Sequence, residues 1–191
     1  DSLDLARHAE SLNYKRFWLA EHHNMKNIAS SATSVLIGYI ANGTEKIRVG
    51  SGGVMLPNHS SLIIAEHFGT LDALYPNRID LGLGRAPGTD ALTAQALGRH
   101  ISNINDSFPQ QLYELENYFS TENETLVHAF PGEGANVPLY LLGSSTDSAW
   151  LAAEFGMPYA FAGHFAPEKM QIAFEIYKDN YKPSQKHPEP H

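Results

Sequence analysis

The sequence predicts an α/β fold whose strands form one parallel sheet. Short apolar strand patterns alternate with amphipathic helix patterns along the 191 residues, and most of the strand patterns end in glycine or polar residues. Such alternation requires parallel strands joined by right-handed crossovers. Two architectures fit, a doubly wound open sheet and a (β/α)8 barrel. A complete barrel needs about 200 residues or more, so length alone favours the open sheet.

The first half of the chain shows regular helix patterns. A helix capped at the first residues is expected to end near Asn13, with Leu5, Ala9 and Leu12 on its buried side. Another helix is expected over 60–74. A helix between these two is expected to end at Gly43 and to bury Ala32, Val35, Leu36 and Tyr39.

Three strand patterns separate these helices. They cover residues 16–21, 47–56 and 79–84, and Pro57 stops the second. In the third strand, three apolar residues and three polar or glycine residues lie on opposite faces. Those faces hold Ile79, Leu81 and Leu83, and Asp80, Gly82 and Gly84.

An arginine follows the third strand directly. If the apolar face of that strand meets helices, its glycine face stays open to a ligand, with Arg85 at its end. A guanidinium beside backbone without side chains suits a planar or phosphorylated ligand. The alternative is that Arg85 pairs with a nearby carboxylate.

The second half alternates less regularly. We expect a helix over 91–98, an exposed loop over 101–107, a helix that starts at Pro109, and no element over 120–136. Strands are expected over 139–142 and 158–163, with a helix containing Leu151, Ala152 and Phe155 between them. Pro167 should open a helix containing Met170, Ala173, Phe174 and Tyr177, and the proline-rich end over 181–191 should lack regular structure.

Composition excludes several classes of protein. A net charge of −8 argues against a nucleic-acid partner, and no apolar run approaches the length of a membrane span. The chain has no cysteine, which excludes disulfides and thiolate chemistry. It also opens without a basic, apolar leader, so we expect a cytoplasmic protein.

The residues suited to chemistry favour the barrel over the open sheet. They follow nearly every predicted strand, whereas a doubly wound sheet uses only the strand ends at its switch point. In a barrel, all strand ends face one mouth. These residues are Glu21, His22 and His23, then Ser51, Gly52 and Gly53, then Arg85, then Ser144 and Ser145, and finally His164.

Five blocks of sequence carry a resemblance to a known family. The runs 20–24, 48–57, 78–90, 141–145 and 161–167 together resemble the bacterial luciferase-like flavin monooxygenase family. The resemblance implies a TIM (β/α)8 barrel that here lacks the first strand and the last two. It therefore implies one incomplete barrel domain over 1–191, with an irregular excursion over about 99–137.

The resemblance assigns roles to the first two strand ends. His22 matches the catalytic histidine and Glu21 matches a carboxylate of the flavin site. Neighbouring strand residues point opposite ways, so Glu21 and His23 are expected to face away from His22. Ser51-Gly52 matches a position where the family often has a non-prolyl cis peptide. The alternatives are a backbone-bonded polar residue at His22 and an ordinary β-bulge at Ser51-Gly52.

The later strand ends match a phosphate site and a substrate wall. Arg85 corresponds to the arginine that binds the flavin phosphate, and Gly143, Ser144, Ser145 and Ser148 lie where a helix start supplies hydroxyls and amides. The alternative is that these serines only cap the helix. Asp147 would repel a phosphate unless it points outward. Weaker candidates for the substrate wall are Met55, His164 and Phe165.

The resemblance also implies an activity. The family uses reduced FMN, which a separate flavin reductase supplies, with dioxygen and a small organic substrate, and its members form homodimers through the second and third helices. We therefore expect an FMN-dependent monooxygenase. The alternatives are an F420-dependent oxidoreductase of the same barrel superfamily and a non-catalytic flavin-binding remnant. No metal is expected, because adjacent histidines on a strand cannot readily share one ion.

Overall fold

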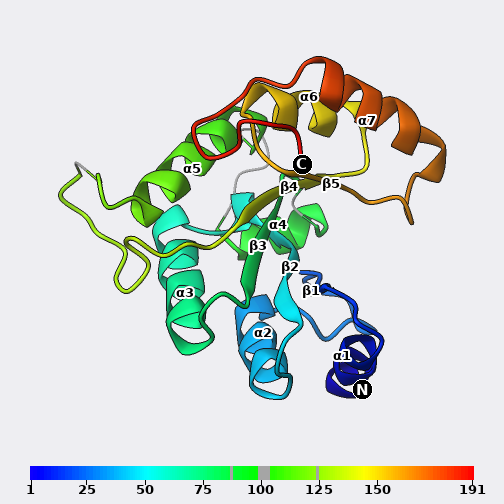
Figure 1. Cartoon of the computed structure of the whole chain (residues 1–191), viewed down its shortest axis with the longest axis vertical. Coiled ribbons are helices and arrows are strands. Elements are labelled where there is room, and N and C mark those ends of the chain that lie inside the picture. Colours follow the sequence, from blue (N-terminus) through cyan, green and yellow to red (C-terminus); the bar gives the residue numbers. More distant parts are fainter. Residues whose placement is uncertain (87, 99–103, 124) are drawn as a thin grey trace.

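The strands lie side by side in the order of the chain (Figure 1). The computed structural model describes residues 1–86, 88–98, 104–123 and 125–191. Within them, five parallel strands form one sheet in which each strand pairs with the next, without the reversal of strand order that defines a doubly wound sheet. The prediction of an incomplete barrel is confirmed. The strands are β1 (Arg16–Leu19), β2 (Arg48–Met55), β3 (Ile79–Gly84), β4 (Leu139–Gly143) and β5 (Tyr159–Phe161).

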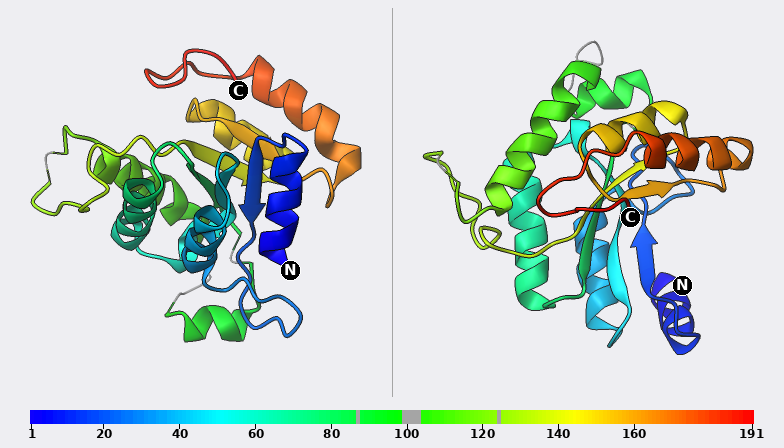
Figure 2. Two further views of the ribbon diagram at one scale, coloured as in Figure 1. Left: turned by 60° about the horizontal axis from the view of Figure 1, so that its bottom comes forward. Right: turned by 45° about the horizontal axis from the view of Figure 1, so that its top comes forward.

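Helices surround this sheet. In Figures 1 and 2, α2 and α3 lie near β2 and β3, while α6 and α7 lie together beside β4 and β5. No helix in the described ranges has both the length and the hydropathy of a membrane span. The helices are α1 (Ser2–Ser11), α2 (Thr33–Asn42), α3 (Ser61–Leu74), α4 (Ala91–Ala96), α5 (Ile104–Phe119), α6 (Thr146–Glu154) and α7 (Met170–Asp179), with short 3₁₀ turns η1 (Leu56–Asn58) and η3 (Pro167–Lys169).

The apolar core lies between the sheet and these helices. Alternate strand residues contribute to it, as the period-2 pattern of β3 predicts. Ile79, Leu81 and Leu83 are completely buried, and so is Phe68 of α3. These strand residues therefore define the helix-covered face of the sheet.

The opposite face of the sheet carries a buried charge cluster. Asp80 is fully buried and accepts hydrogen bonds from Arg16 Nε at 3.0 Å, Arg48 Nε at 2.7 Å and Trp18 Nε1 at 3.1 Å. Arg16 also donates to the Tyr140 hydroxyl at 2.7 Å. We call Arg16, Trp18, Arg48, Asp80 and Tyr140 the Asp80 cluster. Its contacts join strands β1 to β4 on the face that a barrel turns inward.

The buried sides of α1 and α2 differ from the prediction. Leu5 of α1 is 59% exposed, and Leu12, just beyond that helix, is 57% exposed, whereas Ala6 is buried. In α2, Val35 is 70% and Tyr39 is 55% exposed, while Ile37 and Ile40 pack in the core. Because α2 is apolar on more than one side, periodicity alone does not select its buried face.

Two predictions in the second half need correction. Helix α5 already includes residue 104, so the predicted loop is wrong over 104–107, and residues 101–103 lie outside the described ranges. Pro109 lies inside α5, because the buried face already begins at Phe108. At the chain's end, residues 181–191 form no helix or strand, as predicted, but they are held in place. The carbonyl of His191 accepts from the Tyr159 N–H at 3.1 Å.

Candidate functional site

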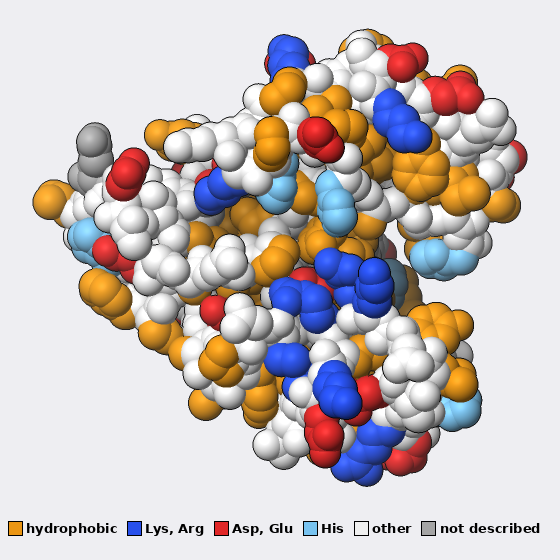
Figure 3. All heavy atoms as spheres, viewed as in Figure 1, with side chains coloured by type: hydrophobic (Ala, Val, Ile, Leu, Met, Phe, Trp, Pro, Cys, Tyr) orange, Lys and Arg blue, Asp and Glu red, His pale blue; other side chains and the backbone are white. Residues whose placement is uncertain are grey.

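A cavity of about 490 Å³ lies at the carboxyl ends of the strands. A row of residues in register, Met55, Gly84, Leu142 and Ala160, crosses four strands and lines it. The space-filling view shows a deep notch between the part of the molecule with α7 and the part with β1 (Figure 3). The carboxyl ends of β2, β3, β4 and β5 therefore meet at one cavity, as predicted.

Most of the candidate site residues line this cavity. They come from the ends of β2, β3, β4 and β5, as the barrel prediction requires. Those that line it are Gly52, Met55, Arg85, Gly143, Ser144, Ser145, Ser148, His164 and Phe165. Glu21, His22 and Ser51 are not among the lining residues.

Arg85 contributes a positive charge to the cavity wall. It lies in the loop after β3 and is half-buried. Within the described ranges no carboxylate forms an ion pair with Arg85, so the alternative of a structural pair has no support there. A guanidinium presents several donors in a planar fork that matches phosphate or carboxylate.

The start of α6 lies on the same cavity. Ser145 is the N-cap and accepts from the Ser148 N–H at 3.4 Å, so the capping alternative holds for its side chain. Ser144 is exposed. Asp147 is also exposed and does not line the cavity, so its carboxylate would not repel a phosphate bound there. The first-turn amides and the positive end of the helix dipole favour an anion here.

Ser148 is engaged with the protein rather than free for a ligand. Its hydroxyl donates to the Ser145 carbonyl at 2.6 Å and lies 2.8 Å from the Tyr159 hydroxyl. Burial raises the pKa of Tyr159 above its ordinary value, against the lowering effect of the Ser148 hydrogen bond, so the phenol stays protonated. A Cβ at Gly143 would lie 2.0 Å from Ser148 Oγ, so glycine is required there.

Ser51 and the glycines of β3 serve strand packing. The buried Ser51 hydroxyl donates to the Gly82 carbonyl at 2.8 Å and accepts from the Gly82 N–H at 3.0 Å. A Cβ at Gly82 would lie 2.3 Å from the Ser51 carbonyl oxygen, and one at Gly84 would lie 2.7 Å from Met55 Sδ. The glycine face is therefore closed by protein at Gly82, whereas Gly84 lines the cavity, so the expected open face is present only at the end of the strand.

The cis peptide bond of β2 lies one residue later than predicted. It joins Gly52 and Gly53, not Ser51 and Gly52. The register with β3 also shifts between Gly52 and Val54, so the β-bulge alternative is present at the same place.

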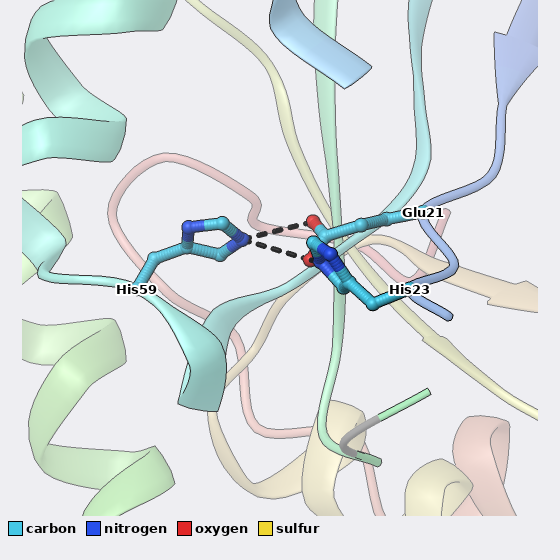
Figure 4. Close-up of side chains that lie close together, drawn as sticks. All are labelled: Glu21, His23 and His59. Carbon is cyan, nitrogen blue, oxygen red and sulfur yellow. Dashed lines mark hydrogen bonds and ion pairs between the residues drawn. The ribbon is translucent and has the colours of Figure 1, made fainter. Parts of the chain in front are cut away.

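Glu21 and His22 point in different directions after β1. The Glu21 carboxylate is 1% exposed and contacts His23 and His59 instead of the cavity (Figure 4). Burial alone would raise the pKa of Glu21, but hydrogen bonds from His59, His23 and the Met55 N–H lower it below its usual value. The predicted role of Glu21 at the cofactor is therefore not supported by a direct contact with this cavity.

His22 contacts the backbone. Its Nδ1 lies 3.3 Å from the Gly88 carbonyl oxygen. A carbonyl only accepts hydrogen bonds, so this contact favours a proton on Nδ1 and leaves Nε2 as an acceptor.

Sequence reasoning missed part of the cavity wall and one partner of Glu21. Trp18, Leu142 and Phe161 also line the cavity, as does Gly53, which the sequence placed at a strand end without assigning it a role. Trp18 could have been found from the strand period, since it shares a face of β1 with the charged Arg16. His59 gave no local signal, because it lies 38 residues from Glu21 along the chain.

The sequence matches a family profile and several curated proteins. The profile described as luciferase-like monooxygenase covers residues 1–190. The chain is 61% identical to the uncharacterized protein YvbT of Bacillus subtilis, covering 100% of this chain and 57% of YvbT. It is 58% identical to the luciferase-like monooxygenase of Escherichia coli K12, covering 96% of this chain and 55% of that protein. The chain thus spans just over half the length of these relatives.

Solved structures share the fold. The crystal structure of apo-MsnO8 superposes with a TM-score of 0.94 at 40% identity and covers 100% of this chain and 57% of that one. Two structures at 18% identity share the fold alone. They are the oxygenating constituent of 3,6-diketocamphane monooxygenase of Pseudomonas putida in complex with FMN (TM-score 0.76; 96% and 58% covered) and an F420-dependent secondary alcohol dehydrogenase with an F420–acetone adduct (TM-score 0.77; 93% and 58% covered).

Proposed function

The chain belongs to the luciferase-like monooxygenase family, and from this premise we propose that it forms the cofactor-binding part of an FMN-dependent monooxygenase. The observation that carries the proposal is Arg85, a cavity-lining guanidinium without a carboxylate partner among the described residues, on the same cavity as the start of α6. A cation and a helix N-terminus on one cavity suit a phosphate monoester.

The residues of the cavity fit FMN. The volume of about 490 Å³ falls in the range of ligand pockets. Arg85, Ser144 and the first-turn amides of α6 would hold the phosphate. Gly52, Gly53 and Leu142 would form an apolar surface against which the flavin ring lies, since the two glycines have no side chains that would block it. The side chains of Ser145 and Ser148 would hold the helix start in shape, since their hydroxyls are already engaged there.

The chain's own residues would bind, orient and protect the cofactor. Reduced FMN, when bound, supplies the electrons for the activation of dioxygen. Apolar lining residues such as Leu142 and Phe161 would exclude water from the ring. His22 does not line the cavity, but its Nε2 is proposed to accept a proton, since the Gly88 carbonyl favours the Nδ1–H tautomer.

The outer wall and the surface complete the proposal. Met55, His164 and the 72%-exposed Phe165 would contact a small organic substrate at the mouth. A flavin reductase would supply reduced FMN in the cytoplasm. A homodimer through α2 and α3 is supported by exposed apolar side chains on both helices, among them Val35 and Leu74.

A titration of the 191-residue chain with FMN and with F420 tests the proposal. We expect saturable binding of FMN, which is measured by the change in the visible absorption and the fluorescence of the flavin. Preferential binding of F420 would instead support the deazaflavin alternative, and binding of neither would contradict both.

Turnover separates the enzyme from a flavin-binding remnant. The chain and a form of the length of its relatives are each mixed with reduced FMN, dioxygen and a panel of aldehydes, alkanes and sulfonates. Oxidised product is measured against reactions without protein, because free reduced FMN consumes oxygen. Product formed by the longer form alone would assign turnover to segments beyond these residues.

A further inference from the structure

A carboxylate and two imidazoles converge beside the cavity, on residues that the flavin proposal does not use. Glu21 and His23 follow β1, and His59 follows η1 (Figure 4). Glu21 Oε1 lies 2.8 Å from His23 Nε2 and 2.8 Å from His59 Nε2, and Oε2 lies 3.0 Å from His59 Nε2. We propose that Glu21, His23 and His59 form a binding site for a divalent transition-metal ion of the zinc type.

The donor atoms suit such an ion in kind and in spacing. Imidazole nitrogen favours zinc and its first-row neighbours, whereas magnesium and calcium prefer oxygen ligands alone. One ligand atom from each of the three residues lies within 4.8 Å of the others. Ligands at about 2.0–2.2 Å from a tetrahedral zinc ion lie about 3.3–3.6 Å apart. The 2.8 Å contacts of Glu21 Oε1 with His23 and His59 therefore need to widen by about 0.5–0.8 Å to admit the ion.

Backbone contacts hold two of the three residues from outside the site. The Met55 N–H donates to Glu21 Oε2 at 3.1 Å, and the His59 carbonyl accepts from Gln111 Nε2 at 3.1 Å. The first contact orients the Glu21 carboxylate, and the second holds the backbone that carries the His59 side chain. The three residues lie in the segments that follow β1 and η1, and contacts from β2 and α5 hold these segments.

Access and charge are also suitable. The His23 and His59 side chains are 16% and 27% exposed, so solvent reaches both residues at the edge of the cluster. Glu21 is nearly inaccessible and would supply one negative charge. Three protein ligands leave a further coordination position for water.

The bound ion would connect the segment after β1 to the turn after β2. Glu21 also holds the N–H of Met55, which lines the cavity. The proposed ion therefore stabilises the wall of the cavity without contacting its contents. The proposal does not depend on flavin binding, and none of the three ligands lines the cavity.

Calorimetry of the metal-free chain with ZnCl₂ tests this proposal. We expect one equivalent of Zn²⁺ to bind, Mg²⁺ not to bind, and Zn²⁺ to raise the melting temperature relative to a chelator. His59→Gln and Glu21→Gln should each weaken Zn²⁺ binding by more than about 100-fold. This exceeds the loss of affinity that is usual when a residue that only contacts a metal ligand is mutated.

A matched control uses the other histidine–carboxylate contact on the surface. His128 Nδ1 lies 2.6 Å from Glu133 Oε2 but has no third donor in the described ranges. His128→Gln should leave the Zn²⁺ affinity unchanged. Absence of Zn²⁺ uptake by the wild type would overturn the proposal, and so would equal affinity in wild type and His59→Gln. The melting experiment needs no variant, so the proposal can be rejected even if a variant does not fold.

Discussion

The two ends of strand β3 carry opposite charges in different surroundings. Asp80, near its beginning, is fully buried and accepts from Arg16, Arg48 and Trp18. Arg85, just after its end, is half-buried and lacks a carboxylate partner among the described residues. At the first end, the carboxylate and the two guanidinium groups form hydrogen-bonded ion pairs, which stabilise the inward face of the strands. The charge at the second end has no carboxylate partner in the described part of the chain, which is why we propose that it binds a ligand.

The largest expected effect comes from removing the carboxylate of the Asp80 cluster. Asp80→Ala removes a fully buried carboxylate with three hydrogen bonds and leaves the partly exposed Arg16 and Arg48 without their shared partner, so the free energy of unfolding should fall by about 3–5 kcal/mol. Urea unfolding followed by circular dichroism measures it. A loss below about 1 kcal/mol would show that the Asp80 cluster does not stabilise the fold as we expect.

A smaller effect separates two arginines. Arg16→Ala removes hydrogen bonds to Asp80 and Tyr140 and should cost about 1–3 kcal/mol of stability, whereas Arg85→Ala should change it by less than about 0.5 kcal/mol. The same unfolding experiment, without flavin, compares them. Equal losses would break the contrast between the two ends.

The smallest effect concerns an exposed carboxylate, in contrast to buried Asp80. Asp90 caps α4, and hydrogen bonds from the Thr93 N–H, the Thr93 hydroxyl and Asn24 lower its pKa from 3.8 to about 2. A lowered pKa means that the stabilisation is complete above about pH 4 and is lost as the pH falls towards 2. Asp90→Asn keeps a capping side chain without this titration.

Urea unfolding of both proteins between pH 6 and about pH 2 tests this cap. The difference in stability between wild type and Asp90→Asn should shrink as the pH falls. A difference that stays constant across this range would show that the charge of Asp90 does not stabilise the helix.

The strand ends could be predicted because their positions follow from topology. Once the strands are parallel and consecutive, Arg85, Gly143 and His164 must lie at one edge of the sheet, whatever the lengths of the helices between them. The start of α6 was likewise visible in sequence, because Ser145 is a good cap.

Contacts between distant segments could not be predicted in the same way. Glu21 contacts His59, which nothing local in the sequence connects to it, as well as its neighbour His23. The buried side of α2 depends on which neighbours cover it, so Val35 and Tyr39 were wrongly assigned to the core. At Pro109, packing of Phe108 overrides the usual preference of proline for a helix start.

The most direct test compares FMN with riboflavin, which has the same ring but no phosphate, in wild type and Arg85→Ala. If Arg85 holds the phosphate, the variant should bind FMN about 10–150-fold more weakly, which corresponds to about 1.5–3 kcal/mol, and its affinity for riboflavin should be unchanged. Equilibrium dialysis measures both affinities. An unchanged affinity for FMN, or equal weakening of FMN and riboflavin, would contradict the account.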